Sequence, residues 1–292
     1  MNVSLKSLLP PIDFGWNHVR ARCGVSTCHN KLLTRTVPQS RIGIHMGQQW
    51  YCSPDCFAAA IEIPLAVLSR ERLMDTARNP RLSLGLVMLS RGYLTEDQLR
   101  FAASESRAGE PLEDALVRLG LAGDRELAAA RAAQWGFPVL GHDGSGLMVQ
   151  ADLPKTFLQG FAAAPVHYSP AAKRLLLGFV HQVDHSFLHA IEQIVGCRPE
   201  PCFMTPAEFE AQMQKVTAVP DYQEVVVDEP RTPAQMSRTL GGLALEVGAK
   251  QASIVRCKSW VWARLTSKRR TMDVLFAMKN ATEVMESREL VS

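Results

Sequence analysis

The sequence lacks any long apolar run, and none of its stretches approaches the ~18 residues that a helix needs to span a bilayer. Near the N-terminus a short apolar segment is interrupted by Pro10 and Pro11. It has neither the apolar core nor the small-residue cleavage site of a secretory signal. We therefore expect an unprocessed, cytoplasmic protein without a transmembrane segment.

The sequence also lacks the composition of a disordered chain or of a disulfide-rich secreted domain. Hydrophobic residues make up 47% and charged residues 21% of its 292 residues, an ordinary globular mixture. Its seven cysteines are an odd number, whereas a disulfide framework requires export and paired cysteines. We expect a globular α+β protein of one large or several small domains.

Motifs for catalysis are missing as well. No Gly-x4-Gly-Lys-Ser/Thr loop, which would cradle the phosphates of ATP, occurs anywhere in the sequence. Neither a nucleophile elbow nor a pair of carboxylates in a catalytic context is recognisable. The sequence therefore predicts no catalytic residues and a protein that is not an enzyme.

Four of the seven cysteines are concentrated near the N-terminus. Cys23 and Cys28 bracket a short knuckle. After 23 intervening residues, Cys52 and Cys56 lead into an apolar, helix-like run that begins at Phe57. Zn²⁺ takes four soft ligands at tetrahedral corners, and two close pairs on separate elements provide them. A helix N-terminus also favours thiolates. The pattern predicts a structural Zn²⁺ site that resembles a treble-clef finger.

Other interpretations of the cysteine cluster stay open at this point. Four buried cysteines without metal or a redox pair are alternatives, although neither pair has the x2 spacing of thioredoxin-type motifs. His29 or His45 could replace one ligand. A closed four-cysteine site would leave no open position for catalysis. Whether such a finger binds protein or nucleic acid does not follow from the sequence.

A repeat of 28 residues follows the cysteine cluster. Sliding the sequence against itself places Leu84 on Leu112 and Gly92 on Gly120. Each copy predicts a short helix closed by its glycine, and then a second helix. The second helix of the first copy begins with a capping box at Thr95. Together the two copies predict a unit of four helices.

A strand and helix pattern comes next, and it predicts a small β-β-α-β-α unit. The expected strands and helices, in order, are 164–169, 174–180, 187–195, 199–204 and 206–216.

Composition divides the chain further. A turn-rich acidic stretch separates the α/β unit from a basic segment, in which we expect a helix over 240–248 and strands over 252–256 and 260–265. We expect a zinc-finger-like domain at 1–68, a helical repeat at 70–136, a small α/β unit at 138–216, a linker at 217–233 and a basic C-terminal α/β segment at 234–292.

Residues 80–216 resemble the N-terminal domain of type II secretion and type IV pilus ATPases, the GspE N-terminal domain, including its MshE-type form that binds cyclic di-GMP. The resemblance is carried by Leu84-Gly85, Gly92-Tyr93-Leu94, Thr95 to Leu99, Leu112, Leu116-Val117, Gly120-Leu121-Ala122, Leu127 and Gln134 to Val139. In that family the domain contacts other assembly components. The resemblance therefore implies a protein partner, such as a secretion or pilus assembly component, and residues 70–216 as one domain of this type.

The same resemblance points to candidate ligand-binding residues: Leu84, Gly85, Gly92, Leu112, Gly120 and Gln134. In nucleotide-binding members each repeat begins Arg-Leu-Gly and ends in Gln. Here Ser83 and Pro111 replace the two arginines, Ser106 replaces the first glutamine and Glu113 the second glycine. Losing charge-assisted contacts to both phosphates removes much of the affinity. We expect cyclic di-GMP binding to be lost or altered.

The C-terminal segment is strongly basic. Between Arg231 and Arg270 nine Lys or Arg oppose one acid, Glu246. A continuous strand would align basic and aromatic side chains on one face, which suits nucleic acid. A turn at Lys258-Ser259 would abolish that face and leave solvated basic rims. The candidate anion- or nucleic-acid-binding residues are Arg256, Lys258, Arg264, Lys268, Arg269 and Arg270.

Three histidines, His181, His185 and His189, are spaced by four residues. A strand end at His181 leaves only the other two on one helix. We therefore favour exposed or capping histidines over a metal site.

Three hypotheses for function result. The first is a non-catalytic adaptor or regulatory protein that binds a protein partner through the secretion-ATPase-type domain. The second is a cyclic-dinucleotide sensor with altered specificity. The third is a nucleic-acid-binding regulator that uses the zinc finger and the basic segment.

Overall fold

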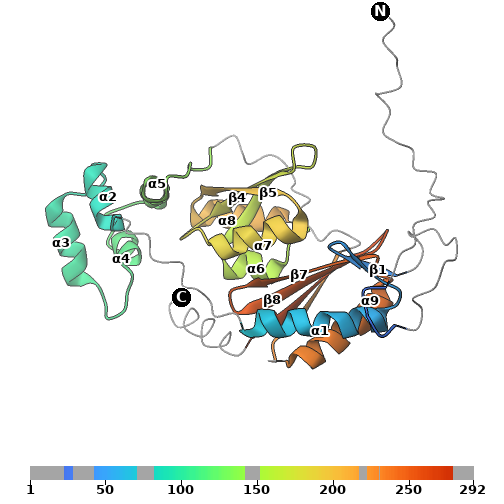
Figure 1. Ribbon diagram of the computed structural model, residues 1–292. Helices are drawn as coiled ribbons and strands as arrows, with labels where there is room; N and C mark the ends of the chain where they lie inside the picture. The colour runs from blue at the N-terminus through green and yellow to red at the C-terminus, as the bar shows by residue number, and fades with distance from the viewer. Residues whose placement is uncertain are drawn as a thin grey trace, which may run out of the picture.

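The computed structural model describes residues 23–28, 43–70, 82–141, 152–216, 222–229 and 231–278. Helices and strands are both abundant and lie in segregated layers, which confirms the α+β class (Figure 1). The predictions for the N-terminus and for His29 concern residues outside these ranges. Among the described helices, none combines the length and the apolar character that crossing a bilayer requires.

The helical repeat forms four short helices: α2 (Leu84–Ser90), α3 (Glu96–Glu105), α4 (Leu112–Arg118) and α5 (Asp124–Trp135). The second pair begins 28 residues after the first pair, as the sequence repeat requires. The unit buries its own core, centred on Met88 and Leu116. Gly92 and Gly120 have φ angles of 73° and 66°, the left-handed conformation that closes α2 and α4.

Local hydrogen bonds set where the second helix of each copy begins. The Thr95 hydroxyl accepts from the Gln98 backbone N–H at 3.2 Å, and the Gln98 side chain accepts from the Thr95 N–H at 2.8 Å. This is the predicted capping box. In the second copy the Gly123 N–H donates to the Glu126 carboxylate at 2.9 Å, so half of the box is kept.

The α/β unit is a three-stranded sheet of order β3-β4-β5 with three helices. Strands β3 and β4 are antiparallel, whereas β4 and β5 are parallel. Every expected element is present, and α6 is additional. The elements are α6 (Lys155–Gly160), β3 (Ala163–Ser169), β4 (Arg174–Phe179), α7 (His185–Val195), β5 (Arg198–Phe203) and α8 (Pro206–Lys215).

A second sheet has six strands in the order β2-β1-β7-β8-β9-β6. Figure 1 shows α1 and α9 on one of its faces and α6 and α7 on the other, so helices separate the two sheets. The elements are β1 (Ile44–Met46), β2 (Gln49–Tyr51), α1 (Pro54–Arg70), β6 (Tyr222–Val227), α9 (Pro233–Val247), β7 (Gln251–Cys257), β8 (Trp260–Thr266) and β9 (Thr271–Ala277).

This sheet joins the two ends of the chain, which the sequence analysis had placed in separate domains. Strand β1 pairs in parallel with β7 at His45–Gln251. Phe57 and Ile61 of α1 enter the same core as Leu240 of α9 and Phe276 of β9. The cysteine-rich segment is therefore built into the C-terminal layer and shares its hydrophobic core.

Strand β6 lies inside the segment expected to be a linker. It pairs in parallel with β9 from Tyr222–Thr271 to Val227–Phe276. Its flanking prolines and acids gave the segment a turn-like composition, and its partner strand is distant in the chain. The pairing depends on β9, so no local pattern could indicate it.

Polar contacts attach the α/β unit to the second face of the six-stranded sheet. The Glu224 carboxylate on β6 accepts from the backbone N–H groups of Lys155 and Thr156, at 2.7 and 3.2 Å, at the start of α6. The rings of Phe157 and Trp262 meet edge to face, with centroids 5.4 Å apart. The two layers are therefore joined by both apolar and polar contacts.

Candidate metal centre

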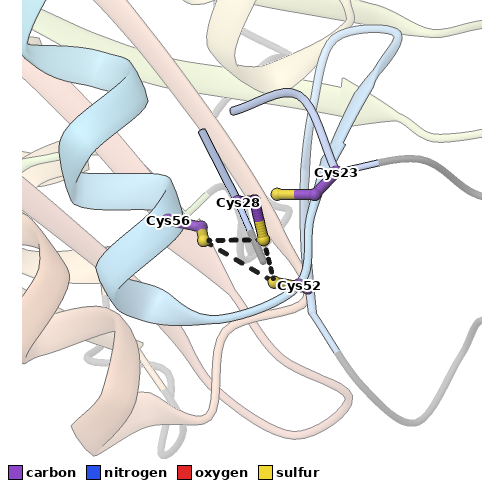
Figure 2. Close-up of side chains that lie close together, drawn as sticks. All are labelled: Cys23, Cys28, Cys52 and Cys56. Carbon is purple, nitrogen blue, oxygen red and sulfur yellow. Dashed lines mark hydrogen bonds between the residues drawn. The ribbon is translucent and has the colours of Figure 1, made fainter. Parts of the chain in front are cut away.

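The four N-terminal cysteines converge on one point (Figure 2). The Sγ atom of Cys28 lies 3.5 Å from that of Cys52 and 3.7 Å from that of Cys56, and the last two are 3.6 Å apart. The Sγ atom of Cys23 joins them, with all four atoms within 4.8 Å of one another. A tetrahedral site with Zn–S bonds of about 2.3 Å places its sulfurs about 3.8 Å apart. The cluster has the dimensions that can hold a metal ion.

Three short elements bring these thiols together. Cys23 and Cys28 flank a knuckle in which the Cys28 N–H donates to the Val25 carbonyl at 3.2 Å. The knuckle is tied to β2 because the Gly24 N–H donates to the Trp50 carbonyl at 2.8 Å. Cys52 directly follows β2 and Cys56 lies in the first turn of α1. Knuckle, hairpin and helix follow one another as in the treble-clef arrangement expected from the sequence.

The chemistry of the donors also suits a metal. Burial raises the pKa of the Cys52 thiol to about 12, and hydrogen bonds with the neighbouring thiols add to the shift. Burial likewise raises the pKa of Cys56. Without a cation, four thiolates would repel one another in this half-buried site, so the thiols keep their protons. A divalent ion reverses this preference, because metal binding releases protons from its thiol ligands.

The metal centre lies directly above the core that unites α1 with the sheet. Cys23 is 7% exposed, and Tyr51 and Phe57 pack edge to face with ring centroids 6.0 Å apart. Residues that follow them on α1 belong to the same core as α9. A metal ion bound by the four cysteines would therefore fix the first turn of α1 next to β2 and the knuckle.

The candidate ligand-binding residues of the helical repeat have structural roles. Gln134 donates its side-chain amide to the Leu82 carbonyl at 2.6 Å. A Cβ atom on Gly85 would approach Leu99 to 3.1 Å and Leu112 to 3.3 Å, so the glycine permits close helix packing. Leu84 and Leu112 pack against the core of the unit. Their use as ligand contacts stays a prediction.

The residues that stand where nucleotide-binding repeats have arginine or glycine also have structural roles in the helical unit. Ser83 caps α2 and accepts from the Leu86 N–H at 3.4 Å. Glu113 pairs with Arg131 at 3.4 Å. Pro111 occupies the N-cap of α4.

The basic residues of the C-terminal segment do not share one strand face, because Lys258-Ser259 forms the turn between β7 and β8. Arg256 donates to the Leu68 carbonyl, and Lys258 pairs with Asp184 at 2.5 Å. Arg264 is buried in an ion pair with Asp273 at 2.6 Å. The exposed loop between β8 and β9 carries the other three candidates: Lys268, Arg269 and Arg270. Anion binding by this loop stays a prediction.

The positions of the histidines agree with exposed or capping residues, the interpretation favoured from the sequence. His185 and His189 lie on the exposed side of α7, and His181 follows the end of β4. The ring nitrogen Nε2 of His189 is 2.8 Å from the Gln193 side-chain nitrogen. Within the described ranges, the N-terminal cysteines form the one group suited to a metal.

A buried polar cluster was missed by the sequence analysis. Asp273 on β9 is fully buried and accepts from Arg264 Nε, Trp262 Nε1 and the Tyr222 hydroxyl, each at 2.8 Å. Arg264 also donates to the Asp152 carbonyl. One signal was present, since a single acid interrupts the apolar run of β9. Its partners come from two other strands, β6 and β8, so spacing alone could not identify them.

A four-helix repeat followed by a small α/β unit is the arrangement that the resemblance implied for an N-terminal domain of secretion and pilus ATPases. No family model matches the chain. It is similar to the type IV pilus assembly ATPase PilB of Thermus thermophilus, with 27% identity over 171 residues. These residues are 56% of this chain and 19% of that protein, so the chain spans about a fifth of its relative. This relative confirms the resemblance found in the sequence.

Two solved structures are also similar. A structure of MshE with cdg has 21% sequence identity and a TM-score of 0.36, and covers 47% of this chain and 100% of that chain. The N-terminal domain of XpsE has 23% identity and a TM-score of 0.36, and covers 46% and 94%. At this level of similarity the two structures say nothing about what the present chain binds.

Proposed function

We propose that this chain is a non-catalytic adaptor or regulatory protein of the cytoplasm. It binds a component of a secretion or pilus assembly through residues 82–216, and four cysteines hold a structural Zn²⁺. The similarity to a pilus assembly ATPase supports the kind of partner. The absence of a phosphate-cradling loop from the sequence supports a role without ATP hydrolysis.

One observation carries the interaction role. Four of the eight large apolar side chains exposed among the described residues lie on the helical unit or at its start. The unit buries a core of its own, so these side chains are not needed to complete it. We infer that these side chains supply the apolar centre of a protein interface. They are Leu82 (65% exposed), Leu86 (52%), Phe101 (50%) and Val117 (45%).

Charging this surface is expected to release the partner. We expect Leu86→Asp combined with Phe101→Asp to reduce recovery of secretion or pilus assembly proteins about tenfold, since burying a charge opposes association. The measurement is quantitative affinity purification from the native cells. Leu245→Asp, which charges an apolar site on α9 that is 70% exposed, is the control and should keep the partners. Equal recovery with the double variant, or recovery of no assembly component by the wild type, would contradict the proposal.

Cyclic di-GMP is expected to leave the thermal stability unchanged. Neither repeat has the arginine of the nucleotide-binding members, and Gln134 is held by the Leu82 carbonyl. A ligand present at 100 times its Kd would add about 2.7 kcal/mol and raise the Tm by several degrees. We expect less than about 1 °C in differential scanning fluorimetry, the same as with GMP. A rise of several degrees with cyclic di-GMP alone would favour the sensor hypothesis.

A further inference from the structure

Helix α1 has two contrasting sides. Phe57, Ile61 and Leu65 are fully buried in the core between this helix and the six-stranded sheet. On the opposite side Ile63 and Val67 are 74% and 55% exposed, and Ile63 is the most exposed large apolar residue among those the structure describes. The outer side of a surface helix normally carries polar residues. The outer side of α1 is therefore an apolar surface that the fold leaves open.

The apolar surface forms a stripe along α1 with Ile63 at its centre. Positions three or four residues apart lie on the same side of a helix. Ala59 and Ala60 precede Ile63 by these intervals. Ala66 and Val67 follow it by the same intervals. The α1 stripe, which we define as these residues together with Ile63, is therefore nearly symmetrical about its centre.

Opposite charges mark the two ends of the α1 stripe. Asp55 lies in the first turn of α1 and Arg70 in the last, and both residues are exposed. Asp55 is eight residues before Ile63, and Arg70 is seven residues after it. The two charges are therefore at almost equal distances from the centre of the stripe. A surface with this layout is complementary to a second copy of itself turned end to end.

Helix α9 lies along one side of α1 and leaves the α1 stripe uncovered. A Cβ atom on Gly241 would approach the Ala58 Cβ to 2.9 Å, so the two helices are in close contact there. Glu62 is four residues after Ala58 and therefore turns toward α9. Figure 1 shows the two helices on the outer surface of the sheet, with no other labelled helix or strand on their outer side. The stripe is thus accessible to another molecule.

We propose that a second copy of this chain covers the α1 stripe, so that the protein is a homodimer. The two α1 helices run antiparallel about a two-fold axis at Ile63. Ile63 then meets Ile63 of the second copy. Ala59 meets Val67 of the second copy, so a larger side chain packs against a smaller one. At each end of the pair, Arg70 comes next to Asp55 of the second copy.

Charge selects the antiparallel pair. Asp55 of the second copy is within one residue of the position opposite Arg70, a difference of ~1.5 Å along the axis that a long side chain spans. The dimer therefore contains two ion pairs, and its helix dipoles oppose each other. A parallel pair would place Asp55 against Asp55 and Arg70 against Arg70, and such like-charge contacts oppose association. The distribution of charge thus favours a second copy, turned end to end, as the occupant of the stripe.

The contact area predicts a weak dimer. A single pair of helices buries less than the ~1,600 Å² of a standard interface. We therefore expect a Kd of about 10 μM. The α1 stripe is separate from the helical unit formed by α2 to α5, so the dimer does not depend on the adaptor role proposed above.

Sedimentation velocity of the full, metal-loaded chain tests the dimer over concentrations from about 1 to 200 μM. We expect a monomer–dimer equilibrium. Ile63→Asp should weaken it at least about tenfold, because the two-fold axis would bring two buried carboxylates together. Leu245→Asp, at a site that is 70% exposed, is the control and should leave the equilibrium unchanged. Leu245 lies beside the start of α1, away from Ile63, because α1 begins and α9 ends where β7 begins.

Charge reversal tests the antiparallel register. Asp55→Lys and Arg70→Asp should each weaken the dimer at least about threefold, since each replaces two ion pairs by two repulsions. An equal mixture of the two variants should associate as the wild type does. In the mixed dimer each changed residue meets an opposite charge on the other chain, and so does each unchanged one. A role of these residues within one chain could not be restored by mixing.

Three results would overturn the inference, with circular dichroism confirming that each variant is folded. The first is a wild-type chain that stays monomeric up to about 200 μM. The second is a dimer that Ile63→Asp leaves intact, and the third is a mixture of the two charge variants that does not recover association. If the chain is monomeric and Ile63→Asp instead removes a protein that co-purifies with the wild type, the stripe binds a different partner and the proposal is wrong.

Discussion

Removing the metal is expected to unfold the layer built from α1, α9 and the six-stranded sheet. Zn²⁺ binding to a four-cysteine site contributes roughly 10 kcal/mol or more, whereas a whole domain is stable by about 5–15 kcal/mol. Cys56 of the cluster lies in the first turn of α1, and Phe57, Ile61 and Leu65 of this helix are fully buried in the core of the layer. Loss of the ion therefore affects residues at both ends of the chain.

The measurement is thermal unfolding of the full chain, followed by circular dichroism, together with zinc quantification on protein purified without added metal. We expect close to one equivalent of zinc per chain. Chelation, or Cys56→Ala, should abolish metal binding and lower the Tm by well over 10 °C, in line with a loss of several kcal/mol. Because protons compete for the thiolates, the metal should be released as the pH falls.

Cys202→Ala is the matched control. Cys202 is also a buried cysteine, but it lies in the α/β unit, among Ala164, Val166 and Met204. Its substitution should cost about 1 kcal/mol for a small cavity and leave the zinc content unchanged. Less than half an equivalent of zinc, or a Tm unaffected by chelation, would disprove the structural zinc site.

Asp273→Asn is expected to destabilise the protein by about 3–5 kcal/mol, because it leaves the charge of Arg264 buried without its counter-ion. Asp273 is fully buried, and Arg264 has a side chain that is 10% exposed. Burial by itself would lower the pKa of Arg264, but the hydrogen bonds and charge of Asp273 raise it instead. When the carboxylate is lost this support is lost too, but the ordinary pKa of arginine is so far above neutral pH that the guanidinium keeps its charge. Urea unfolding at neutral pH measures the change.

Two further variants separate the charge from the hydrogen bonds. Tyr222→Phe removes one donor to the same carboxylate and should cost about 1 kcal/mol. Replacing both partners, Arg264→Met with Asp273→Leu, should recover part of the stability, since a buried ion pair exchanged for apolar residues is often neutral, whereas Trp262 and Tyr222 lose their acceptor. If Asp273→Asn costs less than about 1 kcal/mol, water reaches the cluster and the buried-charge explanation is wrong.

Local features of the fold could be predicted from the sequence because they depend on residues close together in the chain. The capping box at Thr95 and the left-handed glycines Gly92 and Gly120 determine helix ends within a few residues. The same holds for each cysteine pair, since a knuckle and a helix N-terminus are local structures. The convergence of the two pairs also followed, because a tetrahedral metal needs four ligands.

The position of the metal module could not be predicted in this way. Pairing of His45 with Gln251 and packing of α1 on α9 join segments that are far apart in the chain. Strand β6 could not be recognised because the residues on either side of it are typical of turns. The hydrogen-bond partners of Asp273 lie on β6 and β8. In each case the stabilising contact is between distant residues, and no periodicity or spacing records it.

The sequence by itself determined the helical repeat, the small α/β unit, the two cysteine pairs and the likeness to secretion and pilus ATPases, since each resides in short patterns of spacing and capping. Only the tertiary structure decided that the cysteine-rich segment is part of the C-terminal layer and that Arg264 is neutralised inside the protein. These features depend on which segments, far apart in the chain, pack against each other. Burial of a common hydrophobic core determines that packing.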